Sequence, residues 1–285
     1  MTLVTMATLL KRAYEEKYAI PAFNFFNTDF ITAVIETSEE EKAPAILQVH
    51  KMLPGPENRF SWWCAIARSA IERTDIPVAL HLDHGDSFDI AVKAIVSGCS
   101  SVMIDKSALP MAENIAITKR VVDVARVAGT TVEAELGHMT TAQKGESSGL
   151  DESVFTIPEE AAEFVKETGI DALAASVGTV HGLYRGKAEI NFDRLQEINK
   201  LVRKPLVLHG GTGIPDESLK RTAQYGVSKV NVATALGVTY FSTIQVAMRE
   251  QKEAANFFGV TESARQAVKE TIRQKIRLLG CSNRL

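Results

Sequence analysis

Short apolar runs rich in β-branched residues alternate with longer amphipathic stretches along the whole chain. The short runs predict eight strands, at residues 19–24, 44–50, 77–84, 101–105, 131–136, 172–178, 205–210 and 227–233. The stretches between them have apolar residues at helical spacing, and several begin at or after Pro or Asp and end at Gly, as helix capping favours. Strands that alternate with helices favour a parallel sheet.

Eight such units in 285 residues predict an α/β fold, a (β/α)8 TIM barrel that spans residues 1–285 as a single domain. The alternative is an open doubly wound sheet. That fold often carries GxGxxG after its first strand, and this chain has none there. The helical part at 236–279 is longer than one barrel helix. We expect it to form extra C-terminal helices that serve packing or assembly into a homodimer or homotetramer.

Composition and charge argue against several classes of binding partner. The chain is 45% hydrophobic and 24% charged, with a formal net charge of -3, so neither nucleic acid nor an anionic membrane surface is indicated. No apolar stretch approaches the ~20 residues that span a bilayer. The three cysteines are far apart, odd in number and without a CxxC pair, which argues against a disulfide framework or a thiolate metal site. A cytoplasmic protein with a small-molecule partner is expected.

Three histidines each end an apolar run and are each followed at once by glycine: His84 in VALHLDHG, His181 in ASVGTVHG and His209 in PLVLHGGTG. Barrel strands bring their carboxyl ends to one face, and neutral imidazole is a common metal ligand. A buried or capping role would be favoured for one isolated histidine, but three in equivalent places favour a metal. Three protein ligands and one open position are typical of catalytic zinc. His81 is interpreted as a support for the site residues or as structural.

Carboxylates lie beside these strand ends. Asp83 directly precedes His84 and is a candidate for proton transfer to a substrate hydroxyl; the alternatives are a helix N-cap or a partner for a histidine. Asp105 and Glu135 end the next two strands, where they would bind a second cation or hold histidines in place. The alternative for this pair is a salt bridge with a lysine such as Lys106.

Two further segments favour phosphate binding. HGGTG at 209–213 and NVAT at 231–234 end the last two strands, where barrels commonly bind phosphate through backbone N–H groups and a helix N-terminus. The stretch 137–157 is rich in Gly, Ser and Thr and follows the fifth strand. It is interpreted either as a mobile lid on the catalytic face or as a surface insertion.

Together these motifs resemble the class II, zinc-dependent ketose-bisphosphate aldolases, which include fructose-1,6-bisphosphate and tagatose-1,6-bisphosphate aldolases. The resemblance runs from YAIPAFN through HLDHG, SVMID, VEAELG, GTVHGLY, LVLHGGTG and KVNVAT. It implies reversible cleavage of a phosphorylated ketose to dihydroxyacetone phosphate and an aldehyde such as glyceraldehyde 3-phosphate.

The resemblance also implies roles for individual residues. Zn²⁺ would be bound by His84, His181 and His209, with Asp83 handling the proton of the C4 hydroxyl. A second cation, divalent or monovalent, would be bound by Asp105 and Glu135, and Glu146 is the nearest candidate for the proton carrier at the enediolate carbon. The residues that would bind substrate are Asn24, Gln48, Gly182, Gly210, Gly211, Thr212, Asn231, Val232, Ala233 and Thr234.

The chain departs from the family pattern at several positions. The loop after ELG reads HMTTAQKGESSG where family members often have GGxED, which bears on Glu146 and on the aldehyde. Ala233 is typical of tagatose-type members, whereas Gln48 is more like the fructose type. The same chemistry on another phosphorylated ketose or sugar acid therefore stays open. A barrel zinc hydrolase or a non-catalytic sugar-phosphate-binding barrel are alternatives of a different class.

Overall fold

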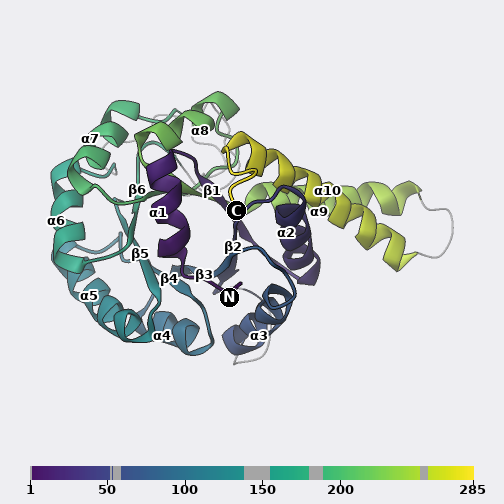
Figure 1. Cartoon of the computed structure of the whole chain (residues 1–285), viewed down its shortest axis with the longest axis horizontal. Helices are drawn as coiled ribbons and strands as arrows, with labels where there is room; N and C mark the ends of the chain where they lie inside the picture. The colour runs from purple at the N-terminus through teal and green to yellow at the C-terminus, as the bar shows by residue number, and fades with distance from the viewer. Residues whose placement is uncertain (1, 52, 54–58, 138–154, 180–188, 251–255) are drawn as a thin grey trace.

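Eight parallel strands close into a barrel in which each strand pairs with the next along the chain and the first pairs with the last (Figure 1). The computed structural model describes residues 2–51, 53, 59–137, 155–179, 189–250 and 256–285. The strands are β1 (Ile20–Asn24), β2 (Ala45–His50), β3 (Val78–Gly85), β4 (Ser101–Ile104), β5 (Thr131–Leu136), β6 (Ala172–Ala175), β7 (Leu206–Leu208) and β8 (Val227–Val232). The predicted TIM barrel is confirmed.

Helices surround this barrel, and two more follow it. The helices are α1 (Met6–Glu16), α2 (Thr28–Glu40), α3 (Arg59–Ile71), α4 (Phe88–Val96), α5 (Met111–Ala128), α6 (Pro158–Thr168), α7 (Phe192–Val202), α8 (Asp216–Thr222), the 3-10 helix η2 (Ala223–Tyr225), α9 (Thr234–Glu250) and α10 (Phe257–Leu278). The last two form the predicted C-terminal extension, which projects to one side of the barrel (Figure 1). No helix in the described ranges is long and apolar enough to cross a membrane.

Helix α1 covers the amino end of the barrel. It lies across the opening in Figure 1, and the Ala7 N–H donates to the hydroxyl of Thr131 at the start of β5. Met6 contacts Ser101, the first residue of β4, with 3.6 Å from Oγ to Sδ. The carboxyl ends of the strands, on the opposite side, are thereby left to carry the site.

Two strands end two or more residues before the position that the sequence predicts. The sixth ends at Ala175 rather than at residue 178, and the seventh ends at Leu208 rather than at residue 210. Both apolar runs lead into glycines with positive φ, 106° at Gly178 and 68° at Gly210. That backbone conformation leaves the extended region, so the ladders end before the apolar runs do. His209 consequently lies just past the end of its strand.

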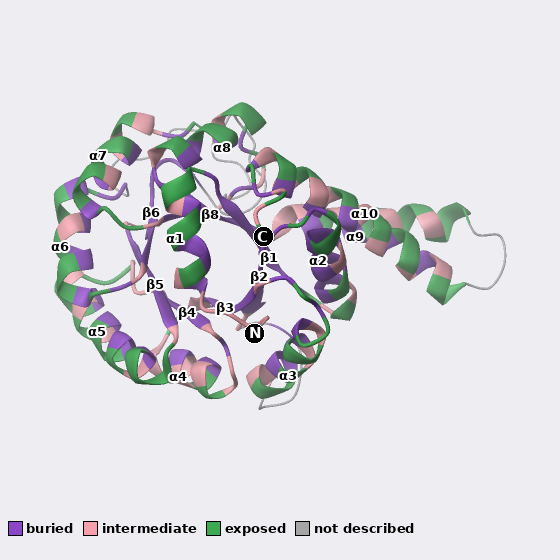
Figure 2. Cartoon of the chain, in the orientation of Figure 1, coloured by how far each residue is buried: buried purple, intermediate pink, exposed green. Residues whose placement is uncertain are grey.

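The barrel interior is buried throughout (Figure 2) but is not apolar throughout. Its carboxyl half holds a set of buried polar and charged side chains that recur at alternate positions of the strands: Asn24, Gln48, His81, Asp83, Glu133, Glu135, His209, Lys229 and Asn231. Because alternate residues of a strand share one face, these side chains meet inside the barrel. Buried charges are expensive unless they are paired, so their partners locate the site.

Outside the barrel, α10 packs against α2 through a row of ion pairs that we call the α2–α10 seam. Its acidic members on and after α2 are Glu36, Glu40 and Glu41, and its basic members on α10 are Arg265, Lys269, Arg273 and Arg277. The basic residues recur every fourth position, which places them on one helix face. The seam attaches the C-terminal extension to the barrel.

Candidate metal centre and active site

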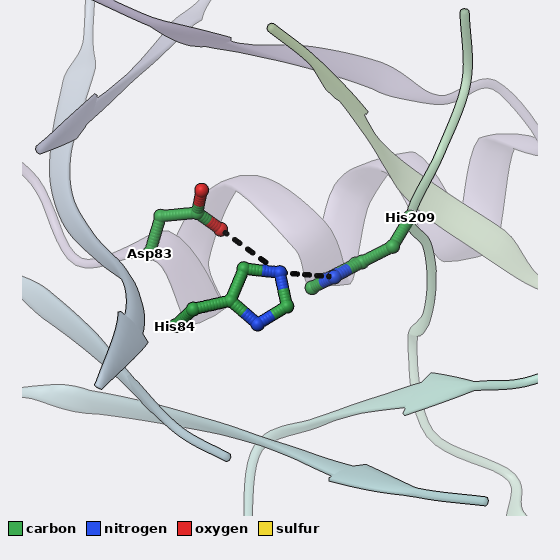
Figure 3. A group of neighbouring side chains, drawn as sticks. All are labelled: Asp83, His84 and His209. Carbon is green, nitrogen blue, oxygen red and sulfur yellow. Dashed lines mark hydrogen bonds and ion pairs between the residues drawn. The ribbon is translucent and has the colours of Figure 1, made fainter. Parts of the chain in front are cut away.

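Two of the predicted metal ligands face each other at the carboxyl end of the barrel. His84 comes from β3 and His209 from just after β7, and His84 Nε2 lies 3.1 Å from His209 Nδ1 (Figure 3). Each ring also contacts a carboxylate through its other nitrogen. His84 Nδ1 lies 2.9 Å from Asp105 Oδ2, and His209 Nε2 lies 2.9 Å from Glu133 Oε1.

These contacts decide which nitrogens can bind a metal. An ionised carboxylate only accepts hydrogen bonds, so His84 Nδ1 and His209 Nε2 carry the protons. The lone pairs of the two neutral rings then lie on His84 Nε2 and His209 Nδ1, which point at one another. Metal-binding histidines commonly have their second nitrogen on a carboxylate in this way. The donor set therefore fits a divalent metal between the two rings.

The charges of the metal-free site agree with that fit. Burial disfavours a charged His84, but Asp83, the hydrogen bond to Asp105 and the charge of Glu135 outweigh it and raise the pKa of His84 to about 9. Burial lowers the pKa of His209, against the hydrogen bond to Glu133. Without a metal, a proton on His84 Nε2 therefore bridges the two rings. A metal ion would replace that proton.

The backbone at His84 brings it and Asp83 to the same side of the strand. Neighbouring strand residues normally point to opposite faces, but His84 has a φ of 49°, and the pairing of β3 with β4 shifts between Leu82 and Gly85. The alternation is broken there. Asp83 Oδ1 consequently lies 3.9 Å from His84 Nε2 (Figure 3), and Asp83, His84 and His209 group their ligand atoms within 4.8 Å.

The Asp83 carboxylate is held by two amides. Asn24 donates to Oδ2 over 2.8 Å and Asn231 donates to Oδ1 over 3.1 Å, while Gln48 donates to the Asn24 oxygen over 2.8 Å. Burial opposes ionisation of Asp83, but electrostatic interactions with His84, His209 and Lys229, with the Asn24 hydrogen bond, hold its pKa well below the ordinary range. Asp83 is ionised and oriented, as a proton acceptor must be.

The predicted second-cation residues lie beside His84. Asp105, Glu135 and His84 place their ligand atoms within 4.8 Å of one another. Glu135 Oε2 also lies 3.7 Å from His209 Nδ1, and Asp105 accepts from the backbone N–H and the hydroxyl of Ser107. Within the described residues, Asp105 pairs with His84 rather than with a lysine. This arrangement allows either role that the sequence left open, a cation site or a support for histidines.

A buried ion pair below the site contains Lys229, which escaped the sequence prediction, and Glu133, which the sequence offered as a further carboxylate beside Glu135. Lys229 and Glu133 are fully buried, and Lys229 Nζ lies 2.9 Å from Glu133 Oε2. Lys229 also donates to the oxygen of Asn231 over 2.7 Å. The available signal was alternation, because Lys229 and Asn231 are two residues apart on one strand and so share its inward face. His81 is also buried beside this pair, with its Nδ1 2.8 Å from the Ser101 hydroxyl and its Nε2 3.6 Å from Glu133 Oε2.

The predicted phosphate segments lie next to each other. A Cβ at Gly211 would come within 2.7 Å of Val230 Cγ1 and 2.9 Å of the Asn231 carbonyl oxygen, so only glycine permits this approach of the two loops. The Thr212 hydroxyl accepts from the N–H of Ala235 in the first turn of α9, over 3.3 Å. The segment from Asn231 through Val232 and Ala233 to Thr234 runs from the end of β8 into α9.

Several predicted residues lie outside the described part of the chain. They are the third histidine, His181, with the neighbouring Gly182, and the proton-carrier candidate Glu146. Most of the predicted lid at 137–157 also lies there.

A family model supplies the decisive comparison. The model described as fructose-bisphosphate aldolase class-II matches residues 4–284. The chain belongs to this family. A probable fructose-bisphosphate aldolase of Bacillus subtilis is 38% identical to this aldolase over 285 residues, which cover 99% of each chain. A fructose-bisphosphate aldolase of Staphylococcus aureus is 39% identical, covering 100% of this chain and 99% of its own.

Solved structures that are described as aldolases superimpose closely on this chain. The YdjI aldolase of Escherichia coli K12 superimposes on this aldolase with a TM-score of 0.87 at 32% identity, covering 99% of this chain and 98% of its own. A putative fructose-1,6-biphosphate aldolase of Coccidioides immitis gives 0.84 at 29% identity, covering 98% and 96%. The protein is therefore an enzyme, a class II aldolase and so a lyase. Its class implies a divalent metal and a sugar-phosphate substrate, in agreement with the histidine–carboxylate groups.

Proposed function

We propose that this class II aldolase binds Zn²⁺ through His84, His181 and His209. In this proposal it reversibly cleaves a ketose 1,6-bisphosphate of the tagatose or fructose type to dihydroxyacetone phosphate and an aldehyde such as glyceraldehyde 3-phosphate. The observation that carries the proposal is the pair of imidazole nitrogens that face each other 3.1 Å apart beside the Asp83 carboxylate. The names of the curated relatives support a bisphosphate substrate.

Asp83 would perform the first proton transfer. Its ionised carboxylate takes the proton of the C4 hydroxyl, the C4–O bond becomes a carbonyl, and the electrons of the C3–C4 bond move onto the C3 fragment. The products of this step are the aldehyde and the enediolate of dihydroxyacetone phosphate. Asn24 and Asn231 keep both carboxylate oxygens oriented during the transfer.

The enediolate is the high-energy species. Zn²⁺, when bound, supplies Lewis-acid stabilisation of the negative charge that develops on the enediolate oxygens. The residues of the chain hold that centre in place: Asp105 orients His84, and Glu133 orients His209. Glu146 is the proposed donor of the proton that converts C3 of the enediolate into the CH₂ group of dihydroxyacetone phosphate. No Schiff-base lysine takes part.

The phosphate of the dihydroxyacetone half would lie between the β7 and β8 loops. Gly182, Gly210, Gly211 and Thr212 would surround it, together with the segment Asn231–Thr234. The support is the close approach of Gly211 to β8 and the glycine-permitted backbone at Gly210, because anions bind to backbone N–H groups in such loops.

Asn24 and Gln48 are proposed to lie near the substrate. Asn24 contacts Asp83 directly, and Gln48 contacts Asn24. The buried oxygen Oε1 of Gln48 has no hydrogen-bond partner within the described ranges. A buried acceptor of this kind has a free-energy cost unless a donor reaches it, and a substrate hydroxyl would be such a donor.

A second cation, divalent or monovalent, is proposed at Asp105 and Glu135. Their grouping with His84 supports it.

We also propose that residues 1–285 act as one aldolase domain, for which the support is the match of the family model over 4–284.

Assembly into a homodimer or homotetramer is proposed through the α9–α10 extension. Large apolar side chains stay exposed on it, with Phe241 at 65% and Phe258 at 82% exposure, and exposed apolar patches commonly mark interfaces. Sedimentation of the wild-type protein and of a Phe241→Ser, Phe258→Ser variant tests this. A monomeric wild type would contradict it. The cytoplasm is proposed as the location. The Cys64 and Cys99 thiols are hydrogen-bonded over 3.5 Å and not joined by a disulfide, which suits its reducing conditions.

The catalytic proposal is tested by a coupled assay for dihydroxyacetone phosphate release. Fructose 1,6-bisphosphate, tagatose 1,6-bisphosphate and other phosphorylated ketoses are compared at equal concentrations, with EDTA and with Zn²⁺ returned. We expect release from at least one bisphosphate, loss with EDTA and recovery with Zn²⁺. Borohydride with substrate should leave no lysine adduct. Cleavage that EDTA leaves unchanged, or a trapped lysine, would contradict the mechanism; preference for another ketose phosphate would correct the substrate.

A further inference from the structure

We propose that Lys229 is a positioning residue that orients both the metal ligand His209 and the base Asp83, although it touches neither the metal site nor the substrate. This inference rests on the proposed function. Lys229 is fully buried in β8, and its ammonium group donates to Glu133 Oε2 over 2.9 Å and to Asn231 Oδ1 over 2.7 Å. Each of these two partners also contacts a functional residue: Glu133 contacts His209, and Asn231 contacts Asp83.

The first path leads to the metal ligand. Glu133 accepts from Lys229 with one oxygen and lies 2.9 Å from His209 Nε2 with the other. An ammonium group only donates, so it holds the carboxylate by one oxygen and leaves the other aimed at the imidazole. Without Lys229 the carboxylate would lose one of these two anchors and could rotate. Lys229 therefore holds Glu133 as the acceptor for the Nε2–H of His209, which leaves Nδ1 to face the metal site.

The second path leads to the base. Asn231 has a carbonyl and an NH₂ at the end of its side chain, and a rotation of 180° would exchange them. Its oxygen faces the Lys229 ammonium, and its nitrogen donates to Asp83 Oδ1 over 3.1 Å. Lys229 therefore selects the orientation in which Asn231 donates to Asp83. The opposite orientation would place an oxygen against the carboxylate and nitrogen donors against the ammonium.

Both paths start at one side chain, so removal of Lys229 should disturb two functions at once. Lys229→Met keeps the side-chain length and removes the charge and the donors. Lys119→Met, at an exposed position of α5, is the matched control. The readouts are the Kd for Zn²⁺ from chelator competition, kcat on fructose 1,6-bisphosphate at saturating Zn²⁺, and the thermal midpoint from circular dichroism.

We expect Lys229→Met to bind Zn²⁺ about 10–100-fold more weakly and to lose at least about tenfold in kcat when saturated with Zn²⁺, as for other residues that support metal ligands. The control should match the wild type. A purely structural lysine would lower the thermal midpoint and leave Kd and kcat within about twofold of the wild type. That result would overturn the proposal.

A second variant keeps the proposal testable if Lys229→Met does not fold. Lys229→Met combined with Glu133→Gln removes both buried charges together. The new amide at position 133 can still accept from His209, while Asn231 has lost its donor. Low kcat at saturating Zn²⁺ in this variant supports the Asn231 path, whereas wild-type kcat overturns it. A wild-type enzyme that binds Zn²⁺ but cleaves no ketose phosphate contradicts the proposed function instead. In that case the Kd for Zn²⁺ still tests the path from Lys229 through Glu133 to His209.

Discussion

The barrel interior and the α2–α10 seam both join acids to bases, yet their environments give the pairs different roles. Lys229 and Glu133 are completely buried, whereas Glu40 in the seam keeps 46% of its side chain exposed. Water screens and competes with the seam pairs, so each contributes little. Inside the barrel each charge depends on its partner, and removal of one partner from such a pair typically costs about 3–5 kcal/mol. The interior pairs can therefore fix geometry, while the seam attaches a helix.

The largest effect should follow removal of a facing histidine. His84→Ala and His209→Ala each delete one of the two ring nitrogens that converge on the proposed ion. We expect bound Zn²⁺ and aldolase activity to be lost together, measured by elemental analysis and by dihydroxyacetone phosphate release. Full activity in a zinc-free variant would remove the metal from the mechanism.

Removal of the Asp83 carboxylate should separate chemistry from metal binding. Asp83→Ala leaves His84 and His209 in place, so the variant should still bind Zn²⁺. Its kcat should fall roughly 10²–10⁴-fold, the usual contribution of a general acid–base group. A loss below about tenfold would assign the proton transfer to another group.

Zinc affinity should depend on pH with a defined sign. The pKa of His84 in the metal-free protein is raised to about 9, so below that pH Zn²⁺ must displace the proton that bridges the two rings. The apparent affinity should rise roughly tenfold per pH unit between pH 7 and 8 and level off above about 9. Chelator competition at several pH values measures this dependence. Affinity that does not change from pH 7 to 8 would show that no such proton is displaced.

The smallest effect is expected in the seam. Glu40 contacts Lys269 over 2.8 Å and Arg273 over 2.5 Å, but it is nearly half exposed. Glu40→Gln should change the free energy of unfolding by less than about 1 kcal/mol and leave kcat unchanged. Urea denaturation and the aldolase assay check both. A loss as large as that expected for a buried pair would remove the distinction between the two regions.

The sequence predicted the barrel because alternating strand and helix patterns are local and repeat eight times. It also placed His84 and His209 at or directly beside the carboxyl ends of their strands. It overextended the sixth and seventh strands, since buried residues such as Val177 continue the apolar run after the ladder has ended. A run of apolar residues predicts which residues are buried. It does not predict where a strand ends, because that depends on the backbone conformation at Gly178 and Gly210.

The side-chain network was harder to predict than the ligands. Asp83 and His84 should point apart by strand alternation, and only the left-handed backbone at His84 brings them together. Lys229 was missed because a lysine in an apolar run has no visible partner until the barrel closes. Glu133, Asn231 and His209 come from three different strands or strand ends, so their meeting is a property of the tertiary fold.

We expect one metal ion to bind to both His84 Nε2 and His209 Nδ1 when the protein is loaded with zinc. Anomalous diffraction at the zinc edge from crystals of the zinc-loaded protein tests it most directly. The expected result is a peak about 2.0–2.1 Å from both nitrogens, the usual zinc–imidazole distance, with His181 as the third protein ligand. A zinc peak elsewhere, with no ion bound to these two nitrogens, would contradict it.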